Sequence, residues 1–151
     1  MENSEYQGMT DDQIAQYNLS RAQRLPRSEA DIKSLSDIIR QTGYQVHIYL
    51  GAGYLEKVYE NALKHRLEMA GHHVDAQVKL VVKDIDGYVI GNYEADLFVD
   101  SKIIVELKAV KALDRAHEAQ LMNYLKASKM KVGLLCNFAE SSFVYRRLVY
   151  N

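Results

Sequence analysis

Apolar residues recur at helical spacing in two successive segments of the N-terminal half. The first starts at Ser28, where a serine followed by acidic residues is typical of a helix N-terminus, and it continues to about Leu50. Glycines at positions 51 and 53 interrupt the pattern, and a second segment runs from about Tyr54 to Gly71. Its predicted apolar stripe consists of Leu55, Val58, Tyr59, Ala62, Leu63 and Leu67. We therefore expect two consecutive helices.

Beyond this second helix the apolar period changes from helical to strand-like. Turn signals at 84–87 and 100–101 divide the next stretch into three strands, which such short connections pair antiparallel. The elements that follow are a helix from Asp114, its N-cap, to about Ser128, and strands over 131–138 and 142–150. The order ααβββαββ predicts an α/β fold in which helices flank a mixed central sheet.

Residues 1–27 are polar, contain the only proline, Pro26, and have no sustained periodic apolar face. The segment TDDQIAQYN can form a short helix capped by Thr10. With 151 residues and 48% hydrophobic composition, the chain can bury one core but not two comfortable ones. We treat residues 1–27 as an N-terminal appendage and residues 28–151 as a single domain.

The net charge of −1 gives the chain no global attraction to nucleic acid or to an anionic membrane. The charge is uneven, because residues 1–101 carry a net −6 and residues 102–151 a net +5. Exposed lysines and arginines of the C-terminal half can form a local phosphate-binding strip or can simply be solvated. These residues are Lys126, Lys129, Lys131, Arg146 and Arg147.

The single cysteine, Cys136, excludes an intramolecular disulfide and a cysteine-ligated zinc or iron–sulfur site. Its apolar neighbours in KVGLLCNF predict a buried core thiol. There is no signal peptide and no apolar run long enough to span a bilayer. We expect a cytoplasmic protein with no membrane partner.

Charged residues interrupt the apolar strands at three positions. Glu106 and Lys108 are two residues apart in one strand and therefore share a face, and Asp96 lies in the preceding strand. A two-residue loop would place Asp96 opposite Val105, whereas a three-residue loop over 100–102, or an equivalent bulge, places Asp96 opposite Glu106. We predict the second arrangement.

Two carboxylates would then lie roughly 4–5 Å apart in a partly buried place, where their repulsion is on the order of 4 kcal/mol. A divalent cation offsets this repulsion, and oxygen ligands from Asp and Glu favour Mg²⁺ or Mn²⁺. Lys108, on the same face, can orient a water molecule or stabilise charge on a phosphate.

Helical residues beside the apolar stripes complete this set: Glu56 opens the second helix, and Gln120 and Tyr124 lie one turn apart on the third. Each of these residues alone is more simply explained as a solvated side chain or as part of a weak surface ion pair. Tyr54, Tyr59, Tyr93 and Tyr124 are candidates for base stacking, although the sequence does not separate them from core tyrosines.

The succession of Asp96 and then Glu106-Leu107-Lys108 on the next strand resembles the core of the PD-(D/E)XK nuclease superfamily, whose restriction-endonuclease-like fold runs helix, three strands, helix, strand. Residues 53–59, GYLEKVY, are similar to the signature of its GxxExxY group. Residues 120–124, QLMNY, resemble the QxxxY motif of RecB-like nucleases. The resemblance covers about residues 30–150.

This resemblance implies that Asp96 and Glu106 ligate the metal together with the Leu107 carbonyl, and that Glu56 binds it directly or through water. Lys108 would be the catalytic lysine. Ala95 stands where the motif has proline, a common departure in the superfamily.

The resemblance further implies that Gln120 and Tyr124 position the lysine, the water or a phosphate. His117, one turn before Gln120, matches a position of the GxxExxY group. The resemblance leaves its role open between packing, contact with a phosphate and catalysis. Lys126, Lys129 and Lys131 are the candidate nucleic-acid contacts.

We therefore expect a divalent-metal-dependent phosphodiesterase that cleaves nucleic acid, with DNA the expected type and homo-oligomerisation open. A non-catalytic nucleic-acid-binding or protein-interaction module that keeps the fold is the alternative, favoured by the near-neutral charge. A third interpretation makes Glu106 and Lys108 a structural ion pair, which leaves Asp96, Glu56 and Gln120 as coincidences.

Overall fold

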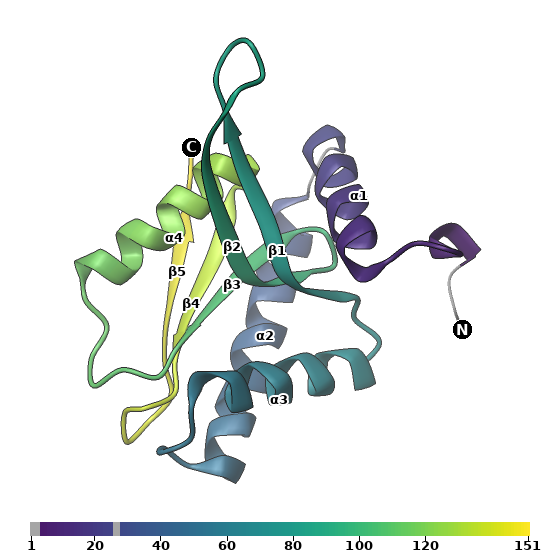
Figure 1. Ribbon diagram of the computed structural model, residues 1–151. Coiled ribbons are helices and arrows are strands. Elements are labelled where there is room, and N and C mark those ends of the chain that lie inside the picture. The colour runs from purple at the N-terminus through teal and green to yellow at the C-terminus, as the bar shows by residue number, and fades with distance from the viewer. Residues whose placement is uncertain (1–3, 26–27) are drawn as a thin grey trace.

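The computed structural model describes residues 4–25 and 28–151 (Figure 1). Its helices are the 3₁₀ turn η1 (Ser4–Tyr6), α1 (Asp11–Arg24), α2 (Glu29–Leu50), α3 (Glu56–Met69) and α4 (Arg115–Ser128). Its strands are β1 (Val74–Lys83), β2 (Val89–Val99), β3 (Ile103–Lys108), β4 (Val132–Asn137) and β5 (Val144–Val149). From α2 onward the order is ααβββαββ, as predicted.

The strands form one five-stranded sheet in the order β1-β2-β3-β4-β5. Only β3 and β4 are parallel, and α4 makes the crossover between them, whereas the other three neighbouring pairs are antiparallel. The prediction of a mixed sheet with three antiparallel strands first is confirmed.

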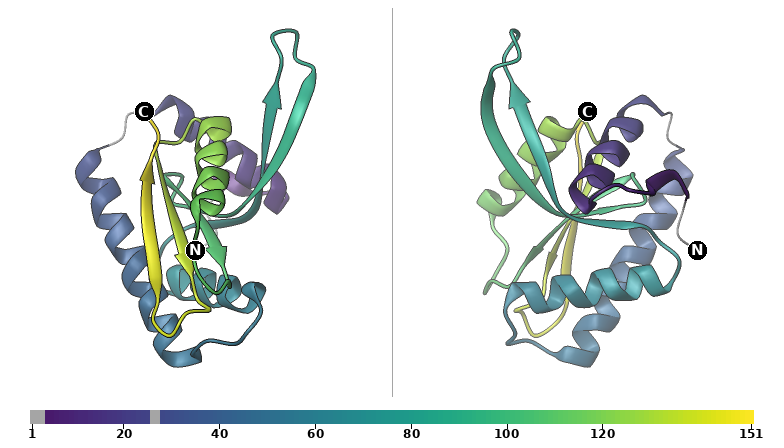
Figure 2. Two further views of the ribbon diagram at one scale, coloured as in Figure 1. Left: turned by 90° about the vertical axis from the view of Figure 1, so that its left-hand side faces the viewer. Right: turned by 45° about the vertical axis from the view of Figure 1, so that its right-hand side comes forward.

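Helices cover both faces of the sheet (Figures 1 and 2). The core under α2 and α3 contains Ile103, Val105 and Leu107 of β3, whereas Ile104 of the same strand packs in the core under α1 and α4. This alternation places the side chains of Glu106 and Lys108 on the face of α4. Cys136 of β4 is fully buried, as predicted, and burial raises the pKa of its thiol to about 12.

Helix α1 begins at the predicted cap, Thr10, whose hydroxyl accepts a hydrogen bond from the Gln13 backbone N–H. The helix packs against β1 and contributes buried Ala15, Leu19 and Ala22 to the α1–α4 core. Two of these three contacts come from alanines, so the buried face of α1 carries little hydrophobic signal in the sequence. The division into an appendage and a domain at residue 28 stays a prediction, and Pro26 lies outside the described residues.

Helix α3 begins at Glu56, two residues later than predicted, with Leu55 as its N-cap. The predicted apolar stripe is wrong at its start, because Leu55 and Val58 are exposed. The Tyr59 hydroxyl donates a hydrogen bond to the Gly51 carbonyl (2.6 Å) and accepts one from the Tyr54 backbone N–H (3.2 Å). These bonds hold the preceding loop outside the helix, so α3 does not begin at Tyr54. Tyr59 is thus a core residue and not a base-stacking one.

The β1–β2 hairpin extends well beyond the rest of the sheet (Figure 2). Its register with β3 covers only Leu97–Val99, at the inner end of β2. Within residues 4–25 and 28–151, no helix combines the length and apolarity that crossing a membrane requires.

Candidate active site

The β2–β3 register pairs Leu97 with Val105 and Val99 with Ile103, leaving residues 100–102 between the strands. Asp100 and Ser101 both have positive φ, which turns the chain tightly at this point. The same register carried one position further places Asp96 opposite Glu106. The prediction of a three-residue connection is confirmed.

Asp96 and Glu106 form the acidic centre of the site. An Asp96 carboxylate oxygen, Oδ2, accepts a hydrogen bond of 2.8 Å from the Leu107 backbone N–H. Glu106 is 4% exposed. Its Oε2 is buried and has no hydrogen-bond partner within the described part of the chain. Burial raises the pKa of the Glu106 carboxyl, and a hydrogen bond to Asp96 and the charge of Asp96 raise it further, to about 10.

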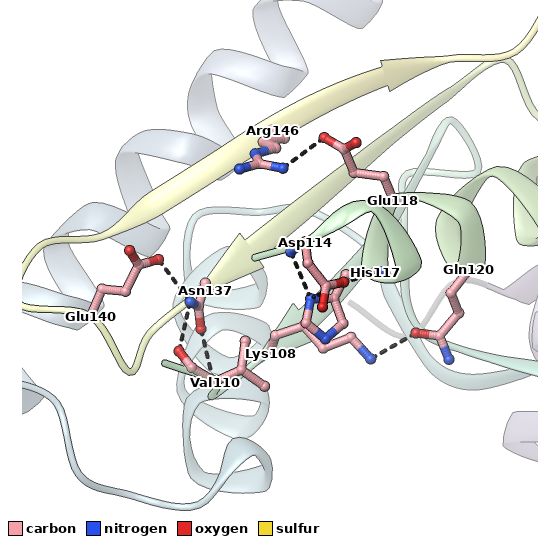
Figure 3. Close-up of polar contacts among 9 residues, drawn as sticks. All are labelled: Lys108, Val110, Asp114, His117, Glu118, Gln120, Asn137, Glu140 and Arg146. Atoms are coloured by element: carbon pink, nitrogen blue, oxygen red, sulfur yellow. Dashed lines mark hydrogen bonds and ion pairs between the residues drawn. The ribbon is translucent and has the colours of Figure 1, made fainter. Parts of the chain in front are cut away.

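Lys108 is held by helix α4. Its Nζ donates a 2.7 Å hydrogen bond to Gln120 Oε1, and Gln120 Nε2 donates to the Tyr124 hydroxyl at 3.0 Å (Figure 3 shows the first bond). Burial first, and then the charge of Glu106, raise the pKa of Tyr124 to about 12, so Tyr124 keeps its proton. This relay fixes the amine beside the two carboxylates.

Glu56 reaches the same place from the first turn of α3. Burial and the charge of Asp96 raise the pKa of its carboxyl, while the charge of Lys108 and a hydrogen bond from the Ala109 backbone lower it. The structure therefore brings Asp96, Glu106, Lys108 and Glu56 together, with Gln120 and Tyr124 behind the lysine.

His117 has a local role at the start of α4. Its backbone N–H donates to Asp114 Oδ1 and its Nδ1 accepts from the Asp114 backbone N–H, both at 3.1 Å, which closes a capping box (Figure 3). A phosphate contact by His117 stays a prediction.

The basic residues singled out in the sequence do not all carry free charge. Arg146 pairs with Glu118 at 2.8 Å (Figure 3), whereas Lys126, Lys129 and Lys131 are exposed at and beyond the C-terminal end of α4. Lys131 precedes Val132, which pairs with the start of β3, whereas Lys108 lies at the other end of that strand. Contact of the three exposed lysines with nucleic acid stays a prediction.

Two site residues are absent from the sequence prediction, Glu60 and Gln77. Glu60 is 3% exposed, and its carboxylate accepts a hydrogen bond from Gln77 Nε2 and pairs with Lys57. Burial raises the pKa of Glu60, and the charge of Asp96 raises it further. Glu60 therefore joins Asp96, Glu106 and Glu56, and we call these four carboxyl groups the acidic cluster. Its spacing of four residues from Glu56 is a signal that could have found it, whereas nothing in the sequence marks Gln77.

Asn137 was also missed. It is fully buried, and its side chain accepts from the Val110 N–H (3.0 Å) and donates to the Val110 carbonyl (2.9 Å) and to Glu140 (2.8 Å; Figure 3). The Phe138 N–H bonds the Lys108 carbonyl at 3.0 Å. Together these bonds extend the β3–β4 ladder past the end of β3 and fix the segment that carries Lys108.

Comparison with known proteins places these residues in a family. A family model described as the PD-(D/E)XK nuclease superfamily matches residues 33–148. The chain belongs to the PD-(D/E)XK nuclease superfamily. The match includes every residue of the acidic cluster and of the lysine relay, while membership of the GxxExxY group stays a prediction.

Two solved structures are similar to this PD-(D/E)XK protein, and the first of them shares its fold. The crystal structure of SSO0001 has 16% sequence identity and a TM-score of 0.52. The alignment covers 95% of this chain and 79% of that chain. An alkaline exonuclease (LHK-Exo) from Laribacter hongkongensis is 9% identical, with a TM-score of 0.46 and coverage of 89% and 76%. No curated protein matches significantly. The predicted α/β fold of this nuclease superfamily is confirmed.

The site of this PD-(D/E)XK protein fits a cation on two grounds. Carboxyl groups converge in a buried place, which raises the pKa of Glu106, and Glu106 Oε2 has no hydrogen-bond partner there. Among the described side chains, however, no three His, Cys, Asp or Glu residues are already gathered as a complete ligand set. A backbone carbonyl or water would have to complete the coordination.

Proposed function

We propose that this protein is a divalent-metal-dependent nuclease that hydrolyses phosphodiester bonds, with DNA as the expected substrate. One observation carries the proposal: the unpartnered Oε2 of buried Glu106 lies beside Asp96, with Lys108 on the same face of the strand. Family membership supports the same chemistry. A cytoplasmic setting is part of this proposal.

The proposed ligands of Mg²⁺ or Mn²⁺ are Asp96, Glu106 and the Leu107 carbonyl, with Glu56 binding directly or through water. When bound, the cation offsets the carboxylate charges and polarises a phosphate oxygen. The Leu107 backbone N–H, which donates to Asp96 at 2.8 Å, holds that carboxylate in place.

Lys108 supplies the positive charge that the protein itself brings to the mechanism. Its ammonium group has three donors and gives one to Gln120, so two remain for the attacking water and a phosphate oxygen. Gln120 is an uncharged acceptor, so this hydrogen bond orients Lys108 without neutralising its charge, which suits the lysine to stabilise negative charge that grows on phosphate. Tyr124, bonded to Gln120, fixes the orientation of the amide.

A non-catalytic nucleic-acid-binding module is the second candidate. Among the described residues, no three His, Cys, Asp or Glu side chains form a ready metal ligand cluster, which favours this candidate. Calorimetric titration with Mn²⁺ separates the two: the nuclease binds Mn²⁺ and loses that binding in Glu106→Ala, whereas the module shows no Glu106-dependent binding.

The deciding experiment is a cleavage assay on single- and double-stranded DNA and RNA with Mg²⁺ and with Mn²⁺. We expect Lys108→Ala to lower cleavage by at least about 100-fold while Mn²⁺ binding persists, because the lysine is not a ligand. Lys111→Ala, an exposed lysine three residues away, is the matched control and should cleave normally. The proposal fails if the wild-type protein leaves all four substrates intact, or if Asp96→Ala cleaves as well as wild type.

A further inference from the structure

The outer part of the β1–β2 hairpin exposes an unusual number of large apolar side chains. Ile85 is 102% exposed, Tyr88 70% and Ile90 59%, and Val81, Val89 and Tyr93 are exposed as well. The hairpin projects from the body of the molecule, so no neighbouring strand covers these residues (Figures 1 and 2). Exposed apolar side chains gathered on one projecting hairpin indicate a binding surface.

This hairpin surface is continuous with the candidate active site. The ring of Tyr93 lies 5.6 Å from the ring of Tyr124, measured between centroids, at an interplanar angle of 53°. Tyr124 is bonded to Gln120, which accepts from Lys108. A chain that leaves the lysine along the hairpin therefore meets Tyr93 first.

The hairpin has room for a flat ligand next to Tyr93. Gly91 is two residues from Tyr93 in β2 and thus on the same face. A Cβ placed on Gly91 would have only Val82 Cβ near it, at 3.9 Å. The glycine leaves open space beside Tyr93 on this face of the hairpin, where a planar group can lie against the strand.

The charge of the hairpin argues against a grip on phosphates. Residues 79–94 contain two lysines and three acidic residues, and Lys79 is paired with Asp12 at 3.3 Å. Duplex nucleic acid presents its phosphates outward and hides its bases, so it needs a basic surface. Unpaired bases offer flat faces that stack on aromatic side chains without charge pairing.

We propose that the outer β1–β2 hairpin is a base-stacking platform that selects unpaired nucleic acid, with Tyr93 contacting the base next to the scissile phosphate and Tyr88 a base further out. The proposal rests on the nuclease function proposed above and names its substrate class. A second copy of the chain is the rival occupant of the same apolar surface.

Binding is measured in the Lys108→Ala protein, so that the probe stays intact, by fluorescence anisotropy with a labelled single strand and with the same strand annealed to its complement. We expect the single strand to bind at least about tenfold more tightly than the duplex. Tyr93→Leu and Tyr88→Leu should each weaken single-strand binding by about 5- to 100-fold, and the Phe variants by less than about twofold, because Phe keeps the stacking ring.

Tyr44→Leu is the matched control, since Tyr44 is an exposed tyrosine of α2, on the opposite face of the sheet. Thermal melting of each variant separates loss of binding from loss of folding. Equal binding by the Leu and Phe variants, or equal affinity for single strand and duplex, overturns the platform. So does a dimer in sedimentation velocity that Tyr88→Leu dissociates.

The two proposals fail in different ways. If wild-type protein binds single strands through Tyr93 but cleaves nothing with Mg²⁺ or Mn²⁺, the nuclease function is wrong and the platform stands. If wild-type protein cleaves single strand and duplex equally and Tyr93→Leu changes neither, the platform is wrong and the nuclease function stands.

Discussion

Gln77 lies opposite Asp96 across the β1–β2 ladder, between the pairs Ala76–Leu97 and Val78–Ala95. The buried side chains of β1 change face at this point, because Ala76 packs with the α2–α3 core and Val78 with the α1–α4 core. Gln77 itself has a positive φ of 53°, which is unusual for a residue other than glycine. The strand is thus bent where it passes the candidate site.

Replacement of Gln77 tests the role of this bend. Gln77→Ala removes the hydrogen bond to buried Glu60 and keeps the strained φ, so we expect it to lower the free energy of unfolding by about 1–3 kcal/mol. Gln77→Gly loses the same bond but relieves the backbone, and should be no less stable than the alanine variant. Urea denaturation measures both. An alanine variant clearly more stable than the glycine variant would contradict the strained backbone.

The buried Glu106 carboxyl predicts an unusual pH dependence in cation-free protein. Its pKa is about 10 in the folded state against an ordinary value of 4.5. Between these values the folded state holds a proton that the unfolded state releases, so the free energy of unfolding falls as pH rises, by up to about 1.4 kcal/mol per pH unit. Urea denaturation in EDTA at several pH values measures this slope.

Glu106→Gln is the control for that slope. Glutamine keeps the shape and does not titrate, so the slope should flatten and the variant should be more stable than wild type above about pH 7, although inactive. Parallel pH profiles for the two proteins would show that another group titrates.

The lysine relay predicts graded losses of activity. Gln120→Ala leaves Lys108 without its acceptor and should lower kcat by about 10- to 100-fold, whereas Tyr124→Phe removes only the outer bond and should cost about 2- to 10-fold. Asn123→Ala, exposed on the same helix, is the control. Steady-state cleavage rates give the ranking, and a Tyr124 effect larger than the Gln120 effect would reverse the relay.

Asn137 predicts a loss of both stability and activity. Asn137→Ala leaves the Val110 N–H and carbonyl without their partners, and should cost about 1–3 kcal/mol and weaken cleavage by releasing the segment after Lys108. Asn137→Asp keeps an acceptor for the Val110 N–H but faces Glu140, and should be intermediate in activity at low pH. Thermal melts and cleavage rates on the same samples distinguish the two effects. Normal activity in a folded Asn137→Ala protein would remove Asn137 from the site.

The parts of the site that follow simple periodic rules could be predicted from the sequence. Residue numbers that pair across an antiparallel hairpin add up to a constant, and the length of the loop fixes that constant. A three-residue loop therefore predicts that Asp96 lies opposite Glu106, in agreement with the register of β2 and β3. Asp114 and Thr10 were recognised as helix caps by side-chain type and spacing.

The missed parts depend on departures from those rules. The positive φ of Gln77 changes the side-chain face of β1, and strict alternation gives no sign of it. Leu55 and Val58 fit a helical stripe but are exposed, because Tyr59 bonds the preceding loop and fixes where α3 begins. Asn137 looks like the end of an apolar strand, and its role depends on Val110, which is far away in sequence.

Full burial of Cys136 has a practical consequence. The chain has one thiol, in β4 under helices α2 and α3, and burial keeps that thiol protonated and out of reach of alkylating reagents. Labelling of this thiol therefore requires that α2 and α3 separate from the sheet or that β4 separate from β3 and β5. The rate at which Cys136 is alkylated thus reports how often this core opens. Mass spectrometry can measure that rate in a crude extract without any engineered probe.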